Sequence, residues 1–442
     1  IVLNEEQTIS MFGQTWELDL YRNSAYGCGL TGHYSFLVMN PANDADAEAP
    51  LWAYLHGGGA GYYDDTGTYV AVKDQTEDTY NHEETFTDLF DDQVMRNSFN
   101  TVTNQPIDST LRRRIEEGYR VLVVSLCDHD MFSGLGTPYT NHPTNPTAEV
   151  NGLEATMAAI DYVAANYPTT QVWAHGTSAG SIGVWALASS YGFEGTALTG
   201  VVADSWITSP RVLTTVAAFA GEPGYPFGAD MELQGLSDKV GFFVTDIPST
   251  PEAQIADRDF REVPVLFIAG NNDPFCGGNQ APLAEAVADG LSNCDWLHDG
   301  LRQVIDAQVD SPHDLHVVNG FGHVPTNEAG PINDVVDDFI IDILTTNPDN
   351  FGNSNAGGNG SPNDSSGNSG NSNIVRDASQ IVLNEEQTIS MFGQTWELAY
   401  YVNDAYQCGL SGDYSFMVMN PGGNPDATAP LWVYLHGGGQ GY

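Results

Sequence analysis

The sequence predicts an α/β protein with a mostly parallel central sheet and helices on both faces of that sheet. First, continuous apolar runs such as residues 50–55 and 119–126 are typical of strands that are buried on both sides. Second, segments with helical spacing alternate with these runs, which favours parallel strands joined by helices. Third, residues 172–180 lead from an apolar strand through a glycine-flanked serine into a helix-like segment. In such sheets the functional side chains lie at the carboxyl ends of the strands.

The patterning of apolar residues assigns the elements in chain order. A turn at residues 26–29 separates the first two strands, and a helix follows the serine turn. Residues 64–110 are acidic and irregular and are predicted to be an insertion, whereas the mixed segment 209–260 is consistent with a lid. The predicted strands cover residues 8–21, 33–39, 50–55, 119–126, the run that begins at residue 172, 198–204, 263–269 and 315–319, and the other predicted helices cover residues 111–118, 147–166, 281–291 and 335–344.

An internal repeat sets the domain organisation, because residues 1–18 recur unchanged as residues 381–398. Asn, Gly and Ser dominate residues 350–373, a composition that cannot bury enough apolar surface to become ordered. We therefore expect a complete domain over residues 1–347 and a flexible linker over residues 348–380. Residues 381–442 would be the truncated N-terminal part of a second, near-identical domain.

The composition limits which binding partners and which cellular location the protein can have. The formal net charge is -45, from 58 acidic residues against 13 Lys and Arg, which argues against nucleic acid and anionic membrane surfaces because both bind basic patches. No apolar run approaches the length of a membrane span. Since the chain begins at Ile1, any signal peptide would lie outside this segment, and the low Lys content favours an exported protein. The five cysteines form no C-x-x-C pair, so zinc is not indicated.

The serine turn has the pattern G-x-S-x-G, formed by Gly176, Ser178 and Gly180. Side chains at the flanking positions would collide in a turn this tight, so both flanks are glycine. The turn is expected to expose Ser178 Oγ above the edge of the sheet. It would also direct the Ala179 N–H and the N-terminus of the following helix toward a neighbouring anion.

Two further candidate residues follow later strands. Asp273 comes after the apolar run 263–269, and His323 comes after the run 315–319. A serine hydroxyl is a poor nucleophile at neutral pH and needs a base, which in turn needs an acid to hold its tautomer. We interpret Ser178 as nucleophile, His323 as base and Asp273 as orienting acid, while His313 and His316 remain competing bases and Asp204 remains a competing acid.

A glycine run supplies candidate donors for an oxyanion. His56 precedes Gly57, Gly58 and Gly59 directly after the apolar run 50–55. The backbone N–H groups of Gly57 and Gly58, together with that of Ala179, are the predicted oxyanion hole, and one such donor stabilises a transition state by about 3 kcal/mol. His56 is interpreted as structural, with its side chain fixing the glycine loop.

Together these motifs resemble the serine carboxylesterases of the α/β-hydrolase superfamily, over about residues 30–345. A narrower resemblance to pectin acetylesterases and Notum carboxylesterases rests on residues 125–134, 176–180 and 203–205, although Ser181 and residues 60–62 depart from that pattern. The resemblance implies a secreted serine ester hydrolase with no cofactor and no metal. Its substrate would be a small-molecule or polymeric ester such as an acylated polysaccharide, with segments 64–110 and 209–260 as the substrate walls.

Two other functions remain open at this stage, as does the oligomeric state. A serine peptidase of the same fold would use the same triad, and a non-catalytic binding module of a multidomain secreted protein would keep the pocket without the chemistry.

The strand order that the resemblance implies also places Cys28 close to Cys127. In the α/β-hydrolase strand order Cys28 precedes the second strand and Cys127 follows the strand beside it, so both sulfurs are expected at the same edge of the sheet and within bridging distance. Cys276 and Cys294 bracket a predicted helix just after Asp273, and a bridge between them would fix that loop. Cys408 matches Cys28 in the repeat and should remain a free thiol, because the copy of its partner lies beyond residue 442.

Overall fold

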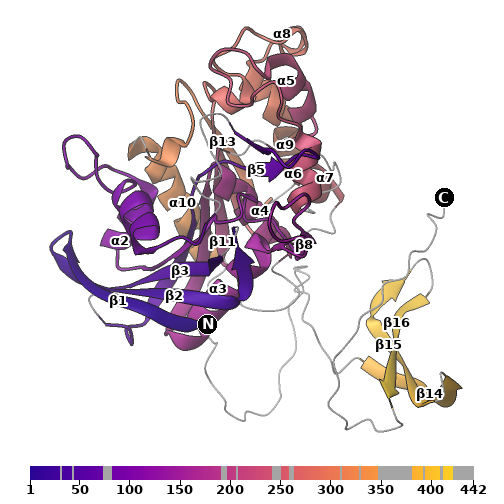
Figure 1. Cartoon of the computed structure of the whole chain (residues 1–442). Helices are drawn as coiled ribbons and strands as arrows, with labels where there is room; N and C mark the ends of the chain where they lie inside the picture. Colours follow the sequence, from indigo (N-terminus) through magenta and orange to yellow (C-terminus); the bar gives the residue numbers. More distant parts are fainter. Residues whose placement is uncertain are drawn as a thin grey trace. The chain divides into compact units, whose positions relative to one another are not determined.

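The computed structural model divides the chain into two units, Ile1–Ala356 and Gly357–Tyr442 (Figure 1). The residues that it describes are 1–29, 32–41, 44–72, 82–190, 197–205, 208–240, 250–257, 263–308, 311–327, 330–346, 381–391, 394–408 and 412–421. The expected linker, residues 348–380, lies outside the described residues.

The first unit is built on a nine-stranded sheet in the order β1-β2-β3-β7-β4-β10-β11-β12-β13. The pairs β1–β2, β2–β3 and β3–β7 are antiparallel. Each further pair of neighbours, from β7–β4 to β12–β13, is parallel. This strand order, with β7 inserted between β3 and β4, is that of the α/β-hydrolase fold, as predicted. The strands are β1 Val2–Met11, β2 Gln14–Cys28, β3 Gly32–Asn40, β4 Ala49–Leu55, β7 Arg120–Val124, β10 Thr169–Thr177, β11 Gly200–Asp204, β12 Val265–Gly270 and β13 Asp314–Val318.

Helices cover both faces of this sheet, because each central strand is apolar on both sides. In β10, Val172 and Ala174 face one hydrophobic core, whereas Trp173 faces the other. Helices α3 and α4 pack on the first face, and α2 and α10 pack on the second. Among the described residues, the helices are η2 Thr87–Met95, α2 Thr110–Glu116, α3 Gly152–Asn166, α4 Ala179–Ser190, α5 Val212–Phe219, α6 Leu233–Val240, α7 Pro251–Asp257, η4 Pro274–Cys276, α8 Ala284–Asp289, α9 Asn293–Ala307, η5 Pro325–Asn327 and α10 Gly330–Thr346.

The N-terminal strand expected over residues 8–21 is wrong, because the structure contains a hairpin there. β1 ends at Met11, β2 begins at Gln14, and these two residues are paired. The two turn residues, Phe12 and Gly13, have φ values of 54° and 75°, as a two-residue hairpin with both central residues left-handed requires. Because Phe12 is apolar, the hydrophobic pattern continues through the turn and hides it.

The segment 64–110 is more regular than predicted. The short strands β5 Gly61–Tyr63 and β6 Tyr69–Ala71 form a hairpin at its start, and η2 follows. η2 buries Leu89, Phe90 and Val94 against the second core, so this acidic stretch carries an apolar face. A second small hairpin pairs β8 Thr137–Pro138 with β9 Glu149–Val150.

The described residues of the segment 209–260 contain three helices, α5, α6 and α7. Figure 1 shows them gathered at one end of the first unit together with α8 and α9. Helix α9 was not predicted, although Leu297, Leu301 and Ile305 recur at helical spacing and are buried. Ser292 caps this helix by accepting a hydrogen bond from the Asp295 N–H. Among the described residues, none of the helices has both the length and the apolar composition needed to cross a bilayer.

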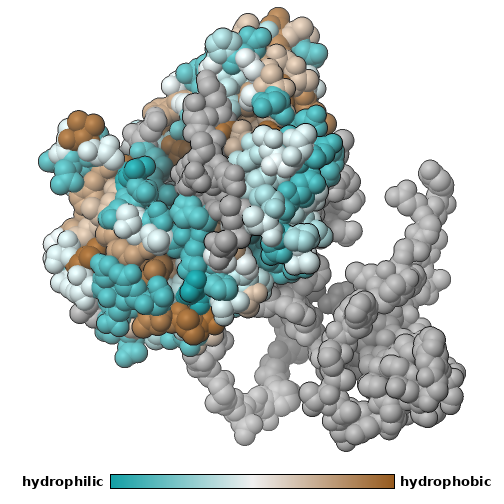
Figure 2. All heavy atoms as spheres, viewed as in Figure 1, coloured by the Kyte–Doolittle hydropathy of each residue, from teal (hydrophilic) through white to brown (hydrophobic). Residues whose placement is uncertain are grey.

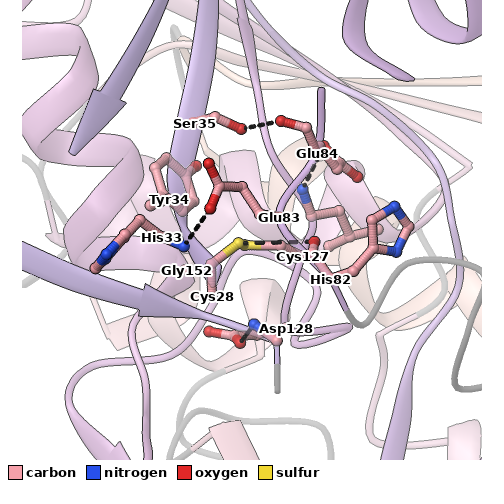
Figure 3. Close-up of a disulfide and its surroundings, with 12 residues drawn as sticks. Cys28, His33, Tyr34, Ser35, His82, Glu83, Glu84, Cys127, Asp128 and Gly152 are labelled. Carbon is pink, nitrogen blue, oxygen red and sulfur yellow. Dashed lines mark hydrogen bonds between the residues drawn. A yellow bond between two sulfur atoms is a disulfide. The ribbon is translucent and has the colours of Figure 1, made fainter. Parts of the chain in front are cut away.

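Both predicted disulfides are confirmed. The Cα atoms of Cys28 and Cys127 lie 5.3 Å apart, and those of Cys276 and Cys294 lie 4.9 Å apart. Figure 3 shows the first bridge joining the end of β2 to the loop after β7, beside Asp128, whose carboxylate accepts a hydrogen bond from the Gly29 N–H at 2.7 Å. The first bridge therefore ties the N-terminal hairpins to the edge of the sheet where the parallel strands end. The side chain of Cys408 lies outside the description, so its free thiol stays a prediction.

Removing these bridges should destabilise the protein by different amounts. They close loops with sequence separations of 99 and 18 residues. On the chain-entropy model, replacing Cys28 and Cys127 by Ala should lower the free energy of unfolding by about 4–5 kcal/mol, and replacing Cys276 and Cys294 by about 3 kcal/mol. Urea unfolding of the two double variants measures this difference, and a larger loss for the shorter loop would contradict the expectation.

The second unit contains a three-stranded antiparallel sheet of β14 Ile381–Met391, β15 Gln394–Cys408 and β16 Gly412–Pro421. Its pairing repeats that of β1, β2 and β3, since Met391 pairs with Gln394 as Met11 pairs with Gln14. The irregularity between Leu3 and Glu5 also recurs between Leu383 and Glu385. The sequence repeat is therefore also a repeat of strand pairing.

Candidate active site

Three predicted residues meet at the carboxyl edge of the sheet. Ser178 lies between β10 and α4, Asp273 follows β12, and His323 follows β13. His323 Nε2 lies 2.7 Å from Ser178 Oγ, and His323 Nδ1 lies 2.9 Å from Asp273 Oδ2. An ionised carboxylate can only accept hydrogen bonds, so Nδ1 carries the proton and Nε2 is left to accept from the serine hydroxyl.

The serine sits on a strained turn that its surroundings hold in place. Ser178 has a φ of 54°, in the left-handed region that side chains disfavour. A Cβ at Gly176 would overlap the Gly180 carbonyl, and a Cβ at Gly180 would overlap the Leu55 carbonyl. Ser181 donates from its N–H and its hydroxyl to the Ser178 carbonyl at 2.9 and 2.6 Å. Both flanking glycines are therefore required, as the sequence pattern predicts.

Asp273 is buried and held from two sides. Its Oδ1 accepts a hydrogen bond from the Phe275 N–H at 2.9 Å, which caps the short helix η4 and leaves Oδ2 facing His323. The sulfur of Cys276 lies 3.3 Å from the Asp273 carbonyl. The ring of Phe275 packs on the ring of His323 with centroids 4.4 Å apart. The second disulfide and Phe275 thus fix the acid and the imidazole in one arrangement.

The competing residues are placed elsewhere. Asp204 is fully buried, and its carboxylate accepts hydrogen bonds from the N–H and hydroxyl of Thr326 and from the Ser205 hydroxyl. His316 lies within β13, and His313 is buried just before that strand, where burial lowers its pKa to about 4. The geometry brings Asp273 and His323 to Ser178 in their place.

Asp204 gives a pH-dependent prediction. Burial raises its pKa to about 6, so the folded protein retains a proton that the unfolded chain releases near pH 4. The stability from this proton is complete below about pH 4 and is lost as the pH rises through about 6. Because Asn cannot ionise, the stability of Asp204→Asn relative to wild type should rise by roughly 2–3 kcal/mol between pH 4 and pH 7. Urea unfolding across this range measures the free energy of unfolding of both proteins. A difference between them that does not change with pH would contradict the raised pKa of Asp204.

The glycine loop lies against the serine. A Cβ at Gly57 would stand 3.1 Å from Ser178 Cβ, so a side chain there would crowd the serine. Ala179 follows Ser178 as the first residue of α4. His56 Nδ1 donates to the Gly57 carbonyl at 2.7 Å. In a trans peptide the N–H points opposite to the carbonyl, so this bond directs the Gly58 N–H away from His56.

A buried glutamate that the sequence did not reveal supports this loop. His56 Nε2 lies 3.4 Å from Glu84 Oε2, and the same carboxylate oxygen accepts from the Leu126 N–H at 3.2 Å. Burial acts to lower the pKa of His56, but the charge of Glu84 and the hydrogen bonds to Glu84 and Gly57 outweigh it and raise the pKa. Glu84 comes from the predicted insertion, and no local motif links it to His56.

A buried lysine joins α6 to β5, the strand that follows the glycine loop. Lys239 Nζ donates to the Gly61 carbonyl at 2.7 Å and to the Tyr139 hydroxyl at 3.1 Å, and it also contacts the Asp128 carbonyl. Burial lowers the pKa of Lys239 to about 8, against the opposing charges of Asp128 and Asp130. Lys239 was not singled out from the sequence, because its partners lie 100 or more residues earlier in the chain.

An apolar cavity adjoins Ser178. The described residues that line it include members of the glycine loop, of α4 and of both segments expected to form substrate walls, with Val72 from the first and Val212, Phe227 and Leu236 from the second. Met131, Thr208 and Phe275 complete the lining among the described residues. Within the described part of the chain, no cluster of three or more His, Cys, Asp or Glu side chains is placed to hold a metal ion.

Among the comparisons with known proteins, only the comparison with solved structures finds similar proteins. No protein-family model matches the chain. No curated protein matches it either. An S-formylglutathione hydrolase from Agrobacterium tumefaciens is 13% identical with a TM-score of 0.40, covering 78% of this chain and 99% of its own. An esterase from Pyrococcus furiosus is 13% identical with a TM-score of 0.39, covering 77% of this chain and 91% of its own. Est1E from Butyrivibrio proteoclasticus is 13% identical with a TM-score of 0.34, covering 77% of this chain and 100% of its own. The fold assignment rests on the strand order of the chain itself.

Proposed function

We propose that the chain is a serine ester hydrolase, with Ser178 as nucleophile, His323 as general base and acid, and Asp273 as orienting carboxylate. One observation carries this proposal: a continuous line of hydrogen bonds runs from Asp273 Oδ2 through both nitrogens of His323 to Ser178 Oγ. Nucleophile, base and orienting acid within hydrogen-bond reach of one another are the arrangement that activates a serine.

The proposed reaction proceeds in two halves. As Ser178 Oγ bonds to the ester carbonyl carbon, its proton passes to His323 Nε2, and the carbonyl oxygen becomes an oxyanion. The bond to the alcohol oxygen then breaks, and His323 returns the proton to the departing alcohol. Water next attacks the acyl-enzyme, with His323 again taking and returning the proton. Asp273 stabilises the imidazolium that forms in each half without itself becoming protonated.

The oxyanion would be stabilised by backbone N–H groups of Gly57, Gly58 and Ala179. Support comes from the contact between Gly57 and Ser178 and from the position of Ala179 at the start of α4. The His56 bond to the Gly57 carbonyl supports a fixed orientation for the following N–H. Donors fixed before the reaction need no reorganisation when charge develops, and this is the source of their effect.

The cavity favours an ester over a peptide as substrate. A peptidase of this fold would be expected to recognise a charged terminus or side chain. Ser178 and Thr208 are the only polar side chains among the described residues that line the cavity. A buried charge without a partner is strongly unfavourable, so a charged peptide group would gain nothing there.

The test is a substrate panel assayed with wild type and Ser178→Ala. It contains p-nitrophenyl esters, acetylated polysaccharides, feruloyl esters and peptide amides. Turnover of at least one ester class, lost in Ser178→Ala, is the expected result. Turnover of peptide amides without esters would indicate the peptidase, and saturable binding of an ester without any turnover would indicate a binding module.

We also propose that the protein works in an oxidising compartment outside the cytosol. The two disulfides support this, because such bonds persist in secreted proteins and are rare where glutathione keeps thiols reduced. Hydrophilic residues cover much of the face shown in Figure 2, in keeping with the large excess of acidic residues.

A further inference from the structure

We propose that the cavity beside Ser178 is an acyl pocket for uncharged aliphatic chains longer than acetyl. This inference rests on the proposed ester hydrolysis and names the substrate class of the same site. It narrows the acyl part of the small-molecule or polymeric ester that the sequence resemblance implies.

The position of His323 decides which half of an ester occupies the cavity. The imidazole must reach the oxygen of the departing alcohol in order to protonate it, so the alcohol lies on the side of His323. His323 is not among the described residues that line the cavity, whereas Ser178 and Ala179 are. Phe275 packs on the His323 ring and also lines the cavity, so the cavity wall adjoins the imidazole without including it. The cavity therefore lies on the side where the acyl group remains after the alcohol departs.

The walls of the cavity set the chemistry of that acyl group. Met131, Ile182, Val212 and Leu236 supply its hydrophobic surface, and each of these side chains is buried. An acetyl group would leave this surface without contacts, whereas a longer aliphatic chain would cover it. A carboxylate or sugar hydroxyl would lose its water without gaining enough partners in return. The net charge of -45 adds a long-range penalty against polyanionic substrates such as pectins.

Helix α6 fixes one wall at a set distance from the serine. It presents Leu233 and Leu236 to the cavity, and Lys239, one turn further on, donates to the Gly61 carbonyl. At the other end of the helix, the Glu232 N–H donates to the Tyr62 hydroxyl at 3.0 Å. Because both ends of α6 are bonded to β5, the strand that follows the glycine loop, Leu233 and Leu236 are held in a set position in the wall of the cavity.

The first experiment measures kcat/KM for p-nitrophenyl acetate, butyrate, hexanoate and laurate with the full chain. Each methylene that enters the pocket should raise kcat/KM by about fourfold, and the increase should stop once the chain exceeds the pocket. The expected optimum lies at butyrate or hexanoate. A kcat/KM that is highest for acetate and falls with every added methylene would overturn the proposal.

The second experiment changes the pocket in both directions. Val212→Trp should reduce its length and lower the hexanoate-to-acetate ratio of kcat/KM by about tenfold or more, and Leu236→Ala should shift the optimum to longer chains. The matched control is Leu213→Trp on the same helix, where the native side chain is 47% exposed and the ratio should stay unchanged. A variant that is merely destabilised would lose activity on all esters, so opposite shifts in the optimum separate a pocket role from a folding defect.

Two further measurements separate the possible failures. In a series of butyrate esters with alcohols of increasing length, followed by titration of the released acid, Val212→Trp should change every rate by the same factor and leave the dependence on alcohol length unchanged. An effect confined to this alcohol series would place the alcohol in the cavity and overturn the inference. A fluorophosphonate probe reports on the reactivity of Ser178 independently of the ester substrates. If Ser178 is labelled but kcat/KM is highest for acetate, the acyl pocket alone is rejected. Absence of both labelling and ester turnover would reject the proposed function as well.

Discussion

Ser178→Ala should abolish ester turnover, with a loss of roughly 10⁶-fold in kcat, because the hydroxyl forms the covalent acyl-enzyme. The buried turn should tolerate the change, since Ala differs from Ser only by the oxygen and the glycines on either side remain. His323→Ala should cause a comparable loss. Because the members of a triad act as one unit, the double variant should be little worse than either single variant.

Initial rates on p-nitrophenyl butyrate and unfolding by urea check this expectation together. Unchanged stability with lost turnover is the expected pair of results for Ser178→Ala. Retention of more than about one tenth of the turnover in a folded Ser178→Ala protein would remove Ser178 as the nucleophile, since no water-mediated route gives such a rate.

Asp273→Asn should lower kcat by about 10⁴-fold while leaving the fold intact. Asn is nearly isosteric, and its side-chain oxygen can still accept from the Phe275 N–H. Its NH₂ group would then face His323 Nδ1 as a donor, which favours the tautomer that carries its proton on Nε2. That tautomer cannot accept the serine proton, and the corresponding change in serine proteases has an effect of this size.

The matched control is Asp204→Asn, the other buried carboxylate at the carboxyl edge of the sheet. Its hydrogen bonds go to Thr326 and Ser205, so its replacement should leave most of the turnover intact. Loss of activity in Asp204→Asn with retention in Asp273→Asn would reverse the assignment of the acid.

The sequence allowed the sheet and the three central site residues to be predicted because their signals are local. Ser178, Asp273 and His323 each follow a strand that a continuous apolar run predicts. Parallel strands bring their carboxyl ends to the same edge of the sheet. The G-x-S-x-G pattern also carries its own steric reason, which the close approach of Gly180 to the Leu55 carbonyl bears out. The Cys28–Cys127 pairing followed from the strand order that the resemblance implies, and the Cys276–Cys294 pairing followed from the position of these residues on either side of a predicted helix.

The parts that could not be predicted depend on contacts between distant segments. The pairing of His56 with Glu84 crosses a stretch that looked irregular, and Lys239 contacts carbonyl groups, which have no sequence signature. The Phe12–Gly13 turn was hidden because an apolar residue occupies it. Helix α9 is different, since the spacing of Leu297, Leu301 and Ile305 and the Ser292 cap were available signals.

The most direct test of the proposed triad is covalent labelling with diisopropyl fluorophosphate, followed by peptide mapping by mass spectrometry. The proposal predicts one phosphoryl group per chain, located on Ser178, with ester turnover falling in proportion to labelling. His323→Ala should label far more slowly, because the serine is then no longer activated. Turnover that persists when Ser178 is fully phosphorylated, or inhibition that coincides with labelling of another residue, would contradict the proposal.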